Sequence, residues 1–250
     1  MLDAIDAGYR LIDTAQAYGN EEAVGKAILK SPVPREELFI TTKVWISNAG
    51  YEKAKKSIEE SLKKMKLDYL DLVLIHQPVN DYYGTYRAME DLNKEGKIKA
   101  IGVSNFYPDR LVDIALFNEI TPAVNQIEIN PFHQQLTAQE VNNKYGVQLQ
   151  AWAPFAEGQN GMFTNPDLKA IGEKYGKSVA QVILRWLLQR GIVPLAKTVK
   201  KERMKQNIDI FDFELSENDM SKISTLDKKQ SSFFNHQEAS AIEMLASFSR

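Results

Sequence analysis

Tyr18 lies five residues after Asp13, and together with Lys43, His76 and Gln126 it belongs to a set of polar side chains in or beside apolar runs. A tyrosine with an ordinary pKa near ~10 is a poor acid at neutral pH, but a neighbouring ammonium stabilises the phenolate and lowers that pKa. Lys43 can supply the ammonium, and the carboxylate of Asp13 can hold it charged and aimed. His76 can donate to the same carbonyl oxygen and orient it. This set suits proton transfer to a carbonyl oxygen.

The other half of such a reaction is a hydride, which no side chain supplies, so a cofactor is implied. The set contains no activated nucleophile. His133 and His236 have no Asp, Glu or Cys partner at a useful spacing, and the chain has no cysteine. We therefore expect no metal site, and we discount a metal-dependent hydrolase.

Short apolar, β-branched runs that alternate with helical patterns would position these side chains. The runs span residues 9–13, 38–44, 69–76, 98–104, 123–129, 147–153 and 192–198. Between them, residues 51–68 carry apolar side chains at spacings of three and four, which predicts a helix. In residues 177–191, Ser178 precedes Gln181 by three positions, a capping-box spacing, and Gly191 ends the pattern.

Strands that alternate with helices at this interval indicate parallel βαβ units, and they predict an α/β fold. No G-x-G-x-x-G follows the first strand, so a (β/α)8 TIM barrel is favoured over an open doubly wound sheet. A parallel barrel closes on about eight strands, whereas the sequence shows seven. We expect one barrel domain over residues 1–250 that is N-terminally incomplete, lacking a hairpin and the first strand.

In such a barrel the carboxyl ends of the strands form the active face. Those ends carry Asp13, Lys43, His76, Ser104 with Asn105, Gln126, Trp152 and Lys197. Because Asp13 and Lys43 lie on consecutive strands, they can neutralise each other, which a buried charge requires.

The composition is that of an ordinary globular protein, with 44% hydrophobic residues and a formal net charge of −2 over 250 residues. This charge provides no basic field for nucleic acid or for anionic lipid. No apolar run approaches the roughly 20 residues of a membrane span, and the N-terminus lacks the features of a signal peptide. We expect a cytoplasmic protein with no nucleic-acid or membrane partner.

Six segments in combination resemble the aldo-keto reductases, and in particular the bacterial 2,5-diketo-D-gluconate and methylglyoxal reductases. The segments are AGYRLIDTAQAYGNEEAVG, TTKVW, LVLIHQP, GVSNF, VNQIEINP and KTVKKERMKQN. The resemblance implies a (β/α)8 barrel that reduces small aldehydes or ketones to alcohols with NADPH, as a monomer or weak homodimer. It also implies that Asp13, Tyr18, Lys43 and His76 form a catalytic tetrad in which Tyr18 is the general acid.

The resemblance carries cofactor contacts over to Ser104, Asn105, Gln126, Trp152, Ala153, Phe155, Lys197, Thr198, Arg203, Gln206 and Asn207. The first three would hold the nicotinamide carboxamide, the indole of Trp152 would stack on the nicotinamide, and residues 153–156 would pack along the pyrophosphate. The last two would meet the adenine.

Lys197, Thr198 and Arg203 would clamp the 2′-phosphate of the adenosine. Two cations and a hydroxyl directed at one phosphate favour NADPH, because NADH offers no phosphate there for them to neutralise. This sequence has Leu195-Ala196-Lys197-Thr198 where the family usually has Ile-Pro-Lys-Ser.

Each of these residues also has a plainer interpretation. Tyr18 alone would be a surface tyrosine, Asp13 with Lys43 a structural ion pair, and His76 or Trp152 a core residue. The cations from Lys197 onward would be the solvated start of a helix. At the level of the whole chain, the alternative to an active reductase is a truncated, inactive barrel that binds cofactor or a protein partner without turnover.

Overall fold

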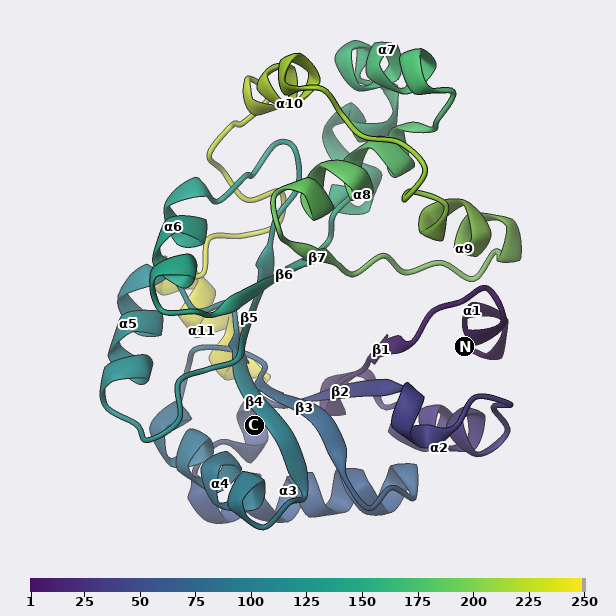
Figure 1. Ribbon diagram of the computed structural model, residues 1–250. Coiled ribbons are helices and arrows are strands. Elements are labelled where there is room, and N and C mark those ends of the chain that lie inside the picture. Colours follow the sequence, from purple (N-terminus) through teal and green to yellow (C-terminus); the bar gives the residue numbers. More distant parts are fainter. Residues whose placement is uncertain (249–250) are drawn as a thin grey trace. The chain divides into compact units, whose positions relative to one another are not determined.

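The computed structural model describes residues 1–248, which form two compact units (Figure 1). The first unit contains residues 1–125, 140–148 and the chain from His236 onward. The second contains residues 126–139 and 149–235. Parallel strands alternate with helices along the chain, which confirms the predicted α/β fold class.

The first unit begins with α1 (Leu2–Asp6), β1 (Leu11–Asp13), the 3-10 turn η1 (Gln16–Tyr18), α2 (Glu21–Leu29), η2 (Arg35–Glu37), β2 (Phe39–Val44) and η3 (Ile46–Asn48). It continues with α3 (Tyr51–Met65), β3 (Leu70–Ile75), α4 (Tyr82–Lys94), β4 (Ile98–Ser104), α5 (Pro108–Leu116) and, near the C-terminus, α11 (Ala239–Ser247). β5 (Val124–Glu128) and α6 (Leu136–Lys144) contribute residues to both units.

The second unit holds most of β6 (Gln148–Trp152), followed by η4 (Ala156–Thr164), α7 (Pro166–Tyr175), α8 (Val179–Gln189), β7 (Val193–Pro194), α9 (Lys201–Ile208) and α10 (Glu217–Ser224). Residues 157–164 form an irregular series of 3-10 turns, and several of them have positive φ angles. The described residues contain the seven predicted strands.

In the first unit the strands β1 to β4 are parallel neighbours in chain order. Their register sets Asp13 beside Thr41 and Lys43 beside Leu74. All six residues of β3 are buried, as expected for a strand covered on both faces, whereas β1 is only half-buried. Helices α3 and α4 pack together along these strands (Figure 1). The parallel register therefore brings the carboxyl ends of β1, β2 and β3 to the same edge.

The predicted helix over residues 51–68 ends earlier, at Met65. Lys66 adopts the left-handed conformation with φ 57°, and its backbone N–H bonds back to the carbonyl of Lys63 at 3.2 Å, which closes the last turn. The predicted capping box of α8 is confirmed, because the Ser178 and Gln181 side chains each bond the other's backbone N–H.

The last predicted strand, residues 192–198, is wrong in extent, because β7 contains only Val193 and Pro194. Pro194 has no N–H to continue a ladder of hydrogen bonds. After one further bond, from the Leu195 N–H to the Ala151 carbonyl at 2.9 Å, the chain leaves the sheet. Lys197 consequently lies on the segment between β7 and α9 and not at a strand end.

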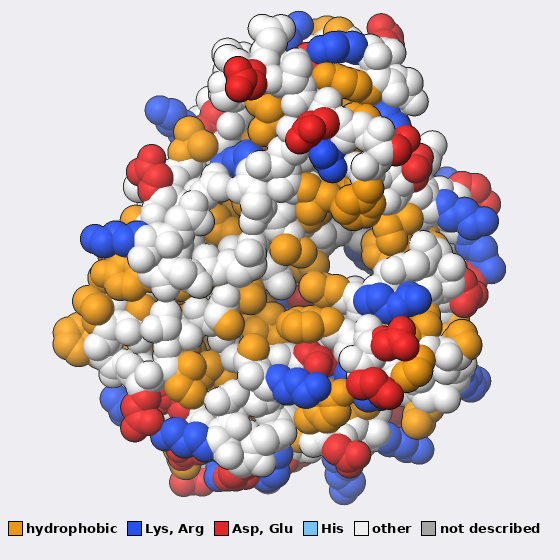
Figure 2. Space-filling model, viewed as in Figure 1, with side chains coloured by type: hydrophobic (Ala, Val, Ile, Leu, Met, Phe, Trp, Pro, Cys, Tyr) orange, Lys and Arg blue, Asp and Glu red, His pale blue; other side chains and the backbone are white. Residues whose placement is uncertain are grey.

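Each unit has its own apolar core, built around β2 to β4 in the first unit and around α8 in the second. Lys and Arg side chains alternate with Asp and Glu on the face shown in Figure 2, in keeping with the net charge of −2. None of the helices within residues 1–248 has both the length and the apolar character needed to span a bilayer.

Candidate active site

Tyr18 is the last residue of η1, the turn that follows β1. Gly19 closes this turn with φ 64°, a left-handed conformation that glycine adopts without steric cost. The side chain of Gln16 anchors the turn, because its Oε1 accepts from the backbone N–H of Trp45 at 3.0 Å and from Asn48 Nδ2 at 2.9 Å. Tyr18 as a whole is 53% exposed, so the turn is anchored while the residue stays accessible from solvent.

Lys43 is fully buried, and its ammonium makes three contacts. It forms an ion pair with Asp13 Oδ1, and it donates to the carbonyl of Thr14 at 3.0 Å and to the Tyr18 hydroxyl at 3.4 Å. The Asp13 carboxylate compensates a charge that would otherwise be costly to bury. The ammonium occupies a lone pair of the Tyr18 oxygen, so the hydroxyl proton stays available to another acceptor.

His76 follows β3 directly, and its ring contacts Tyr18 edge-on at 5.7 Å between ring centroids. The ring of Trp45 contacts it at 5.0 Å. Burial, together with the charge of Lys43, lowers the pKa of His76 to about 3. The imidazole is therefore neutral at physiological pH. Its Nδ1 is buried and has no hydrogen-bond partner in residues 1–248.

The lowered pKa of His76 predicts a pH dependence of stability. Between pH 6.5 and about 3 the unfolded chain binds a proton at His76 that the folded protein does not. The free energy of unfolding is therefore expected to fall as the pH falls through this window, by up to about 1.4 kcal/mol per pH unit. Urea unfolding of wild type and His76→Gln at several pH values from 7 to 4.5 checks this. The variant should show a shallower decline, and equal slopes would contradict the assignment.

Ser104 and Asn105 lie beside His76 in the first unit. Asn105 Nδ2 donates to the backbone carbonyl of His76 at 3.1 Å and to Ser104 Oγ at 3.2 Å. Asn105 holds φ at 62°, a left-handed conformation that asparagine tolerates better than most residues. The structure thus places Asn105, with Ser104 bonded to it, against the backbone of His76.

The remaining predicted cofactor residues all belong to the second unit. Gln126 lies within β5 and donates from Nε2 to Gln150 Oε1 at 3.1 Å. Trp152 ends β6, and its ring contacts Phe233 at 5.3 Å between centroids. Phe155 packs against Phe163 with centroids 5.6 Å apart.

Ala153 and Ala156 follow β6 with φ angles of 45° and 46°. A non-glycine residue in this conformation is strained, and such strain gathers at functional loops.

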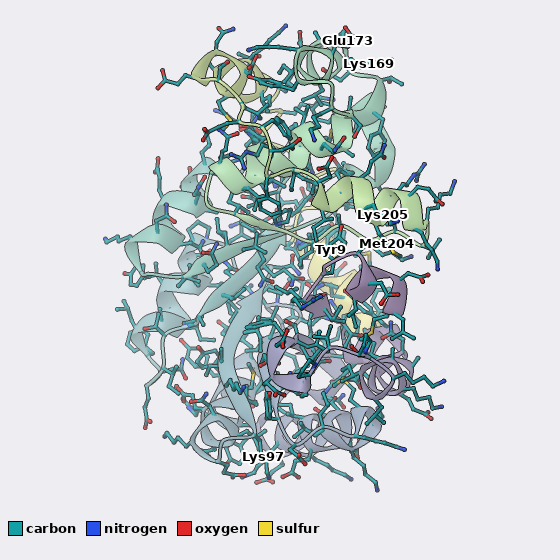
Figure 3. All side chains as sticks on the ribbon, turned by 45° about the vertical axis from the view of Figure 1, so that its right-hand side comes forward. Tyr9, Lys97, Lys169, Glu173, Met204 and Lys205 are labelled. Carbon is teal, nitrogen blue, oxygen red and sulfur yellow. The ribbon has the colours of Figure 1, made fainter. Side chains whose placement is uncertain are left out.

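Lys197 and Arg203 are exposed at the start of the α9 region, where Thr198 Oγ1 caps the turn by accepting from the Lys200 N–H at 3.2 Å. Gln206 is exposed and Asn207 is buried on α9. Figure 3 labels two neighbours on the same helix, Met204, which is buried, and Lys205, which is exposed.

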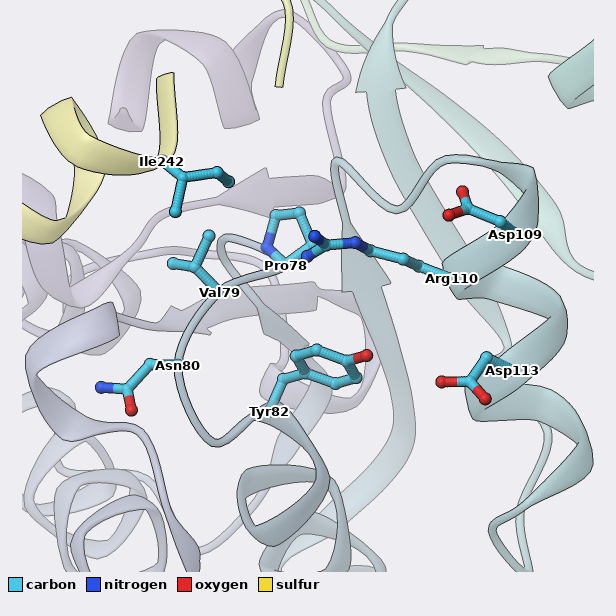
Figure 4. A pocket seen from close by; sticks show the side chains of 8 residues that line it. All are labelled: Pro78, Val79, Asn80, Tyr82, Asp109, Arg110, Asp113 and Ile242. Atoms are coloured by element: carbon cyan, nitrogen blue, oxygen red, sulfur yellow. The ribbon is translucent and has the colours of Figure 1, made fainter. Parts of the chain in front are cut away.

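The loop after His76 also lines a pocket of about 610 Å³ in the first unit. Its walls are Pro78, Val79, Asn80, Tyr82, Asp109, Arg110, Asp113 and Ile242, and Arg110 extends into it from α5 (Figure 4). None of the four predicted catalytic side chains is among these residues, so this pocket is not the space in front of the Tyr18 hydroxyl.

Sequence reasoning missed two residues that shape the site. Gln16 connects the Tyr18 turn to the loop after β2, and it also donates to Ser57 Oγ on α3 at 3.1 Å. Trp45 packs on His76. Trp45 could have been predicted from its position two residues after Lys43, because this spacing places both side chains on one face of the chain as β2 ends. No sequence pattern of this kind pointed to Gln16.

Comparison with known proteins identifies the family. A model of the Aldo/keto reductase family matches residues 1–228. A glyoxal reductase of Bacillus subtilis (strain 168) is 52% identical over 231 residues, which cover 91% of this chain and 82% of that protein.

Two solved structures agree with this match. An aldo-keto reductase from a Medee basin deep-sea metagenome library superposes with a TM-score of 0.92 at 42% identity, over 95% of this chain and 89% of that one. A Bombyx mori aldo-keto reductase in complex with NADP superposes with a TM-score of 0.88 at 38% identity, over 93% and 83% of the two chains. This chain belongs to the aldo/keto reductase family of oxidoreductases.

Proposed function

We propose that this protein reduces the carbonyl group of small aldehydes and ketones to an alcohol with NADPH, and that Tyr18 is the proton donor. One observation carries the proposal: the buried ammonium of Lys43, paired with Asp13, donates to the hydroxyl of Tyr18. This arrangement stabilises the phenolate that forms when Tyr18 gives up its proton.

The four side chains have distinct roles in this proposal. Tyr18 protonates the carbonyl oxygen as negative charge develops on it. Lys43 lowers the cost of the phenolate, and Asp13 keeps the Lys43 ammonium charged and fixed. Neutral His76 offers a ring nitrogen that can orient the same oxygen. Trp45 and Gln16 hold the ring of His76 and the turn of Tyr18 in place.

When bound, NADPH supplies the hydride for the carbonyl carbon. Ser104 and Asn105, beside His76, are suited to hold the carboxamide of its nicotinamide, and we assign Gln126 to the same task. Trp152 would stack on the nicotinamide, and the strained backbone at Ala153 would run with Phe155 along the pyrophosphate. Gln206 and Asn207 would meet the adenine. The solved relative from Bombyx mori binds NADP, which supports this choice of cofactor.

We propose small 1,2-dicarbonyl compounds as substrates, because the Bacillus subtilis relative is a glyoxal reductase and is 52% identical. The test is the loss of NADPH absorbance when the purified protein is mixed with methylglyoxal or glyoxal. Turnover that depends on protein, cofactor and carbonyl together supports the proposal. Quenching of tryptophan fluorescence by NADPH, with no oxidation by several carbonyl compounds, would instead support a protein that binds the cofactor without turning over.

Arg203→Ala is expected to raise the KM for NADPH by about tenfold or more, because a charge-assisted bond to the 2′-phosphate is lost. The KM for NADH should stay near the wild-type value, since NADH has no phosphate at that position. Lys205→Ala is the matched control, because Lys205 is an exposed cation on the same helix. A similar rise in KM for both cofactors would contradict a phosphate contact at Arg203.

The monomeric or weakly dimeric state and the cytoplasmic location expected from the sequence stay predictions.

A further inference from the structure

In the second unit, residues 227–233 run beside the loop that follows β5, and we call residues 227–233 the strap. Two hydrogen bonds align the strap with the loop. The Gln134 N–H donates to Asp227 Oδ1 at 3.1 Å, and the Lys228 N–H donates to the Phe132 carbonyl at 2.8 Å. The strap therefore begins in a fixed register along residues 132–134.

The far half of the strap is held mainly by the carboxylate of Glu128 at the end of β5, and Asn160 Nδ2 adds a longer bond to Ser232 Oγ at 3.4 Å. Glu128 is 4% exposed and accepts three hydrogen bonds. Ser231 Oγ donates to Oε2 at 2.5 Å, and the Ser232 N–H donates to Oε1 at 3.0 Å. Asn130 Nδ2 donates to Oε1 at 3.1 Å from the loop itself. Bonds to an ionised acceptor are about twice as strong as neutral ones, so Glu128 is a firm anchor for the strap.

The strap residue that follows this anchor contacts Trp152. The Ser231 hydroxyl accepts from the Phe233 N–H at 3.0 Å, which sets the direction of the chain at Phe233. The Phe233 ring then lies against the Trp152 indole, 5.3 Å between centroids with the planes inclined at 50°. A continuous path of contacts thus leads from Glu128 through Ser231 and Phe233 to Trp152.

We infer that Glu128 is a positioning residue for hydride transfer, acting through the strap on the indole of Trp152. The inference rests on the proposed function, in which Trp152 stacks on the nicotinamide. A side chain that must hold a cofactor ring needs its own rotamer fixed by neighbours, and small displacements at a hydride donor are costly in rate. Phe233 is suited to supply that restraint, and Glu128 holds the part of the strap that carries Phe233.

The first experiment uses protein without cofactor. Acrylamide quenching of tryptophan fluorescence is measured for wild type, Glu128→Gln and Ser231→Ala, and the same measurements on versions carrying Trp152→Phe isolate the Trp152 contribution. Releasing the strap is expected to raise the quenching constant of Trp152 about twofold through local opening. Ser224→Ala is the matched control, because that exposed hydroxyl bonds only to the Ser221 carbonyl of its own helix turn. Unchanged quenching of Trp152 in both strap variants would overturn the inference.

The second experiment compares kinetics in two backgrounds. Glu128→Gln and Ser231→Ala are each expected to lower kcat/KM for methylglyoxal about tenfold in an otherwise wild-type chain, but by less than about twofold when Phe233→Ala is already present. This loss of effect distinguishes action through Phe233 from general destabilisation, which would persist in both backgrounds. Equal losses in the two backgrounds would overturn the inference. If Glu128→Gln folds poorly, Ser231→Ala still gives the test, because that substitution leaves β5 intact.

The two experiments also separate this inference from the proposed function. If wild type does not oxidise NADPH with any carbonyl compound, the proposed function fails, while the quenching result still decides whether Glu128 restrains Trp152. If wild type is active and quenching does not respond, only the inference fails.

Discussion

Tyr18→Phe is expected to lower kcat for carbonyl reduction by about 10³-fold, the contribution typical of a positioned general acid. The substitution removes only the hydroxyl, whose bond in the structure is the one it accepts from Lys43 at 3.4 Å. Because the ring remains and Tyr18 is 53% exposed, its edge-on contact with His76 and the fold should persist. The measurement is single-turnover NADPH oxidation with methylglyoxal, together with the Kd of NADPH from fluorescence quenching.

The Kd of NADPH should stay within about twofold of wild type, because a proton donor to the substrate oxygen adds little uniform binding energy. Tyr69→Phe is the control for removing a tyrosine hydroxyl, since Tyr69 contacts its neighbours within residues 1–248 through its ring and its backbone carbonyl. If Tyr18→Phe kept most of its activity, or lost cofactor binding while keeping the chemistry, Tyr18 would not be the proton donor.

Lys43→Met is expected to lower kcat by a similar factor, about 10³-fold, because the charge that stabilises the Tyr18 phenolate is gone. Methionine has nearly the same length as lysine, so it fills the space of a side chain that is fully buried. It leaves the Asp13 carboxylate without its ion-pair partner, and removal of one partner from a buried pair destabilises a protein. The variant should therefore lose stability as well as activity.

The double variant Asp13→Asn with Lys43→Met separates these two effects. It removes both charges, so the free energy of urea unfolding should recover toward the wild-type value. Its kcat should stay low, because no ammonium adjoins Tyr18. If activity recovered together with stability, Lys43 would have only a structural role, and the assignment of Tyr18 as an acid that depends on Lys43 would fail.

Several features of the fold could be predicted from the sequence because they depend on local patterns. β4 spans the predicted residues 98–104, and α8 begins with the predicted capping box at Ser178. The ion pair of Asp13 and Lys43 was predictable because neighbouring parallel strands bring their carboxyl ends to one edge. The length of the last strand was overestimated because its apolar pattern continues past Pro194. The missing N–H of Pro194 stops the ladder of hydrogen bonds between the strands.

Other features depend on contacts between residues far apart in the chain, which no local pattern encodes. Gln16 bonds to Ser57, 41 residues away, and Glu128 bonds to Ser231, 103 residues away. His76 could be predicted as a site residue from the sequence. Its lowered pKa comes from burial and from the charge of Lys43, which only the folded chain provides. The sequence alone thus determined which side chains are candidates for the reaction and which strands carry or precede them. The tertiary structure decided which neighbours hold those side chains and in what charge state, because both depend on packing between distant segments.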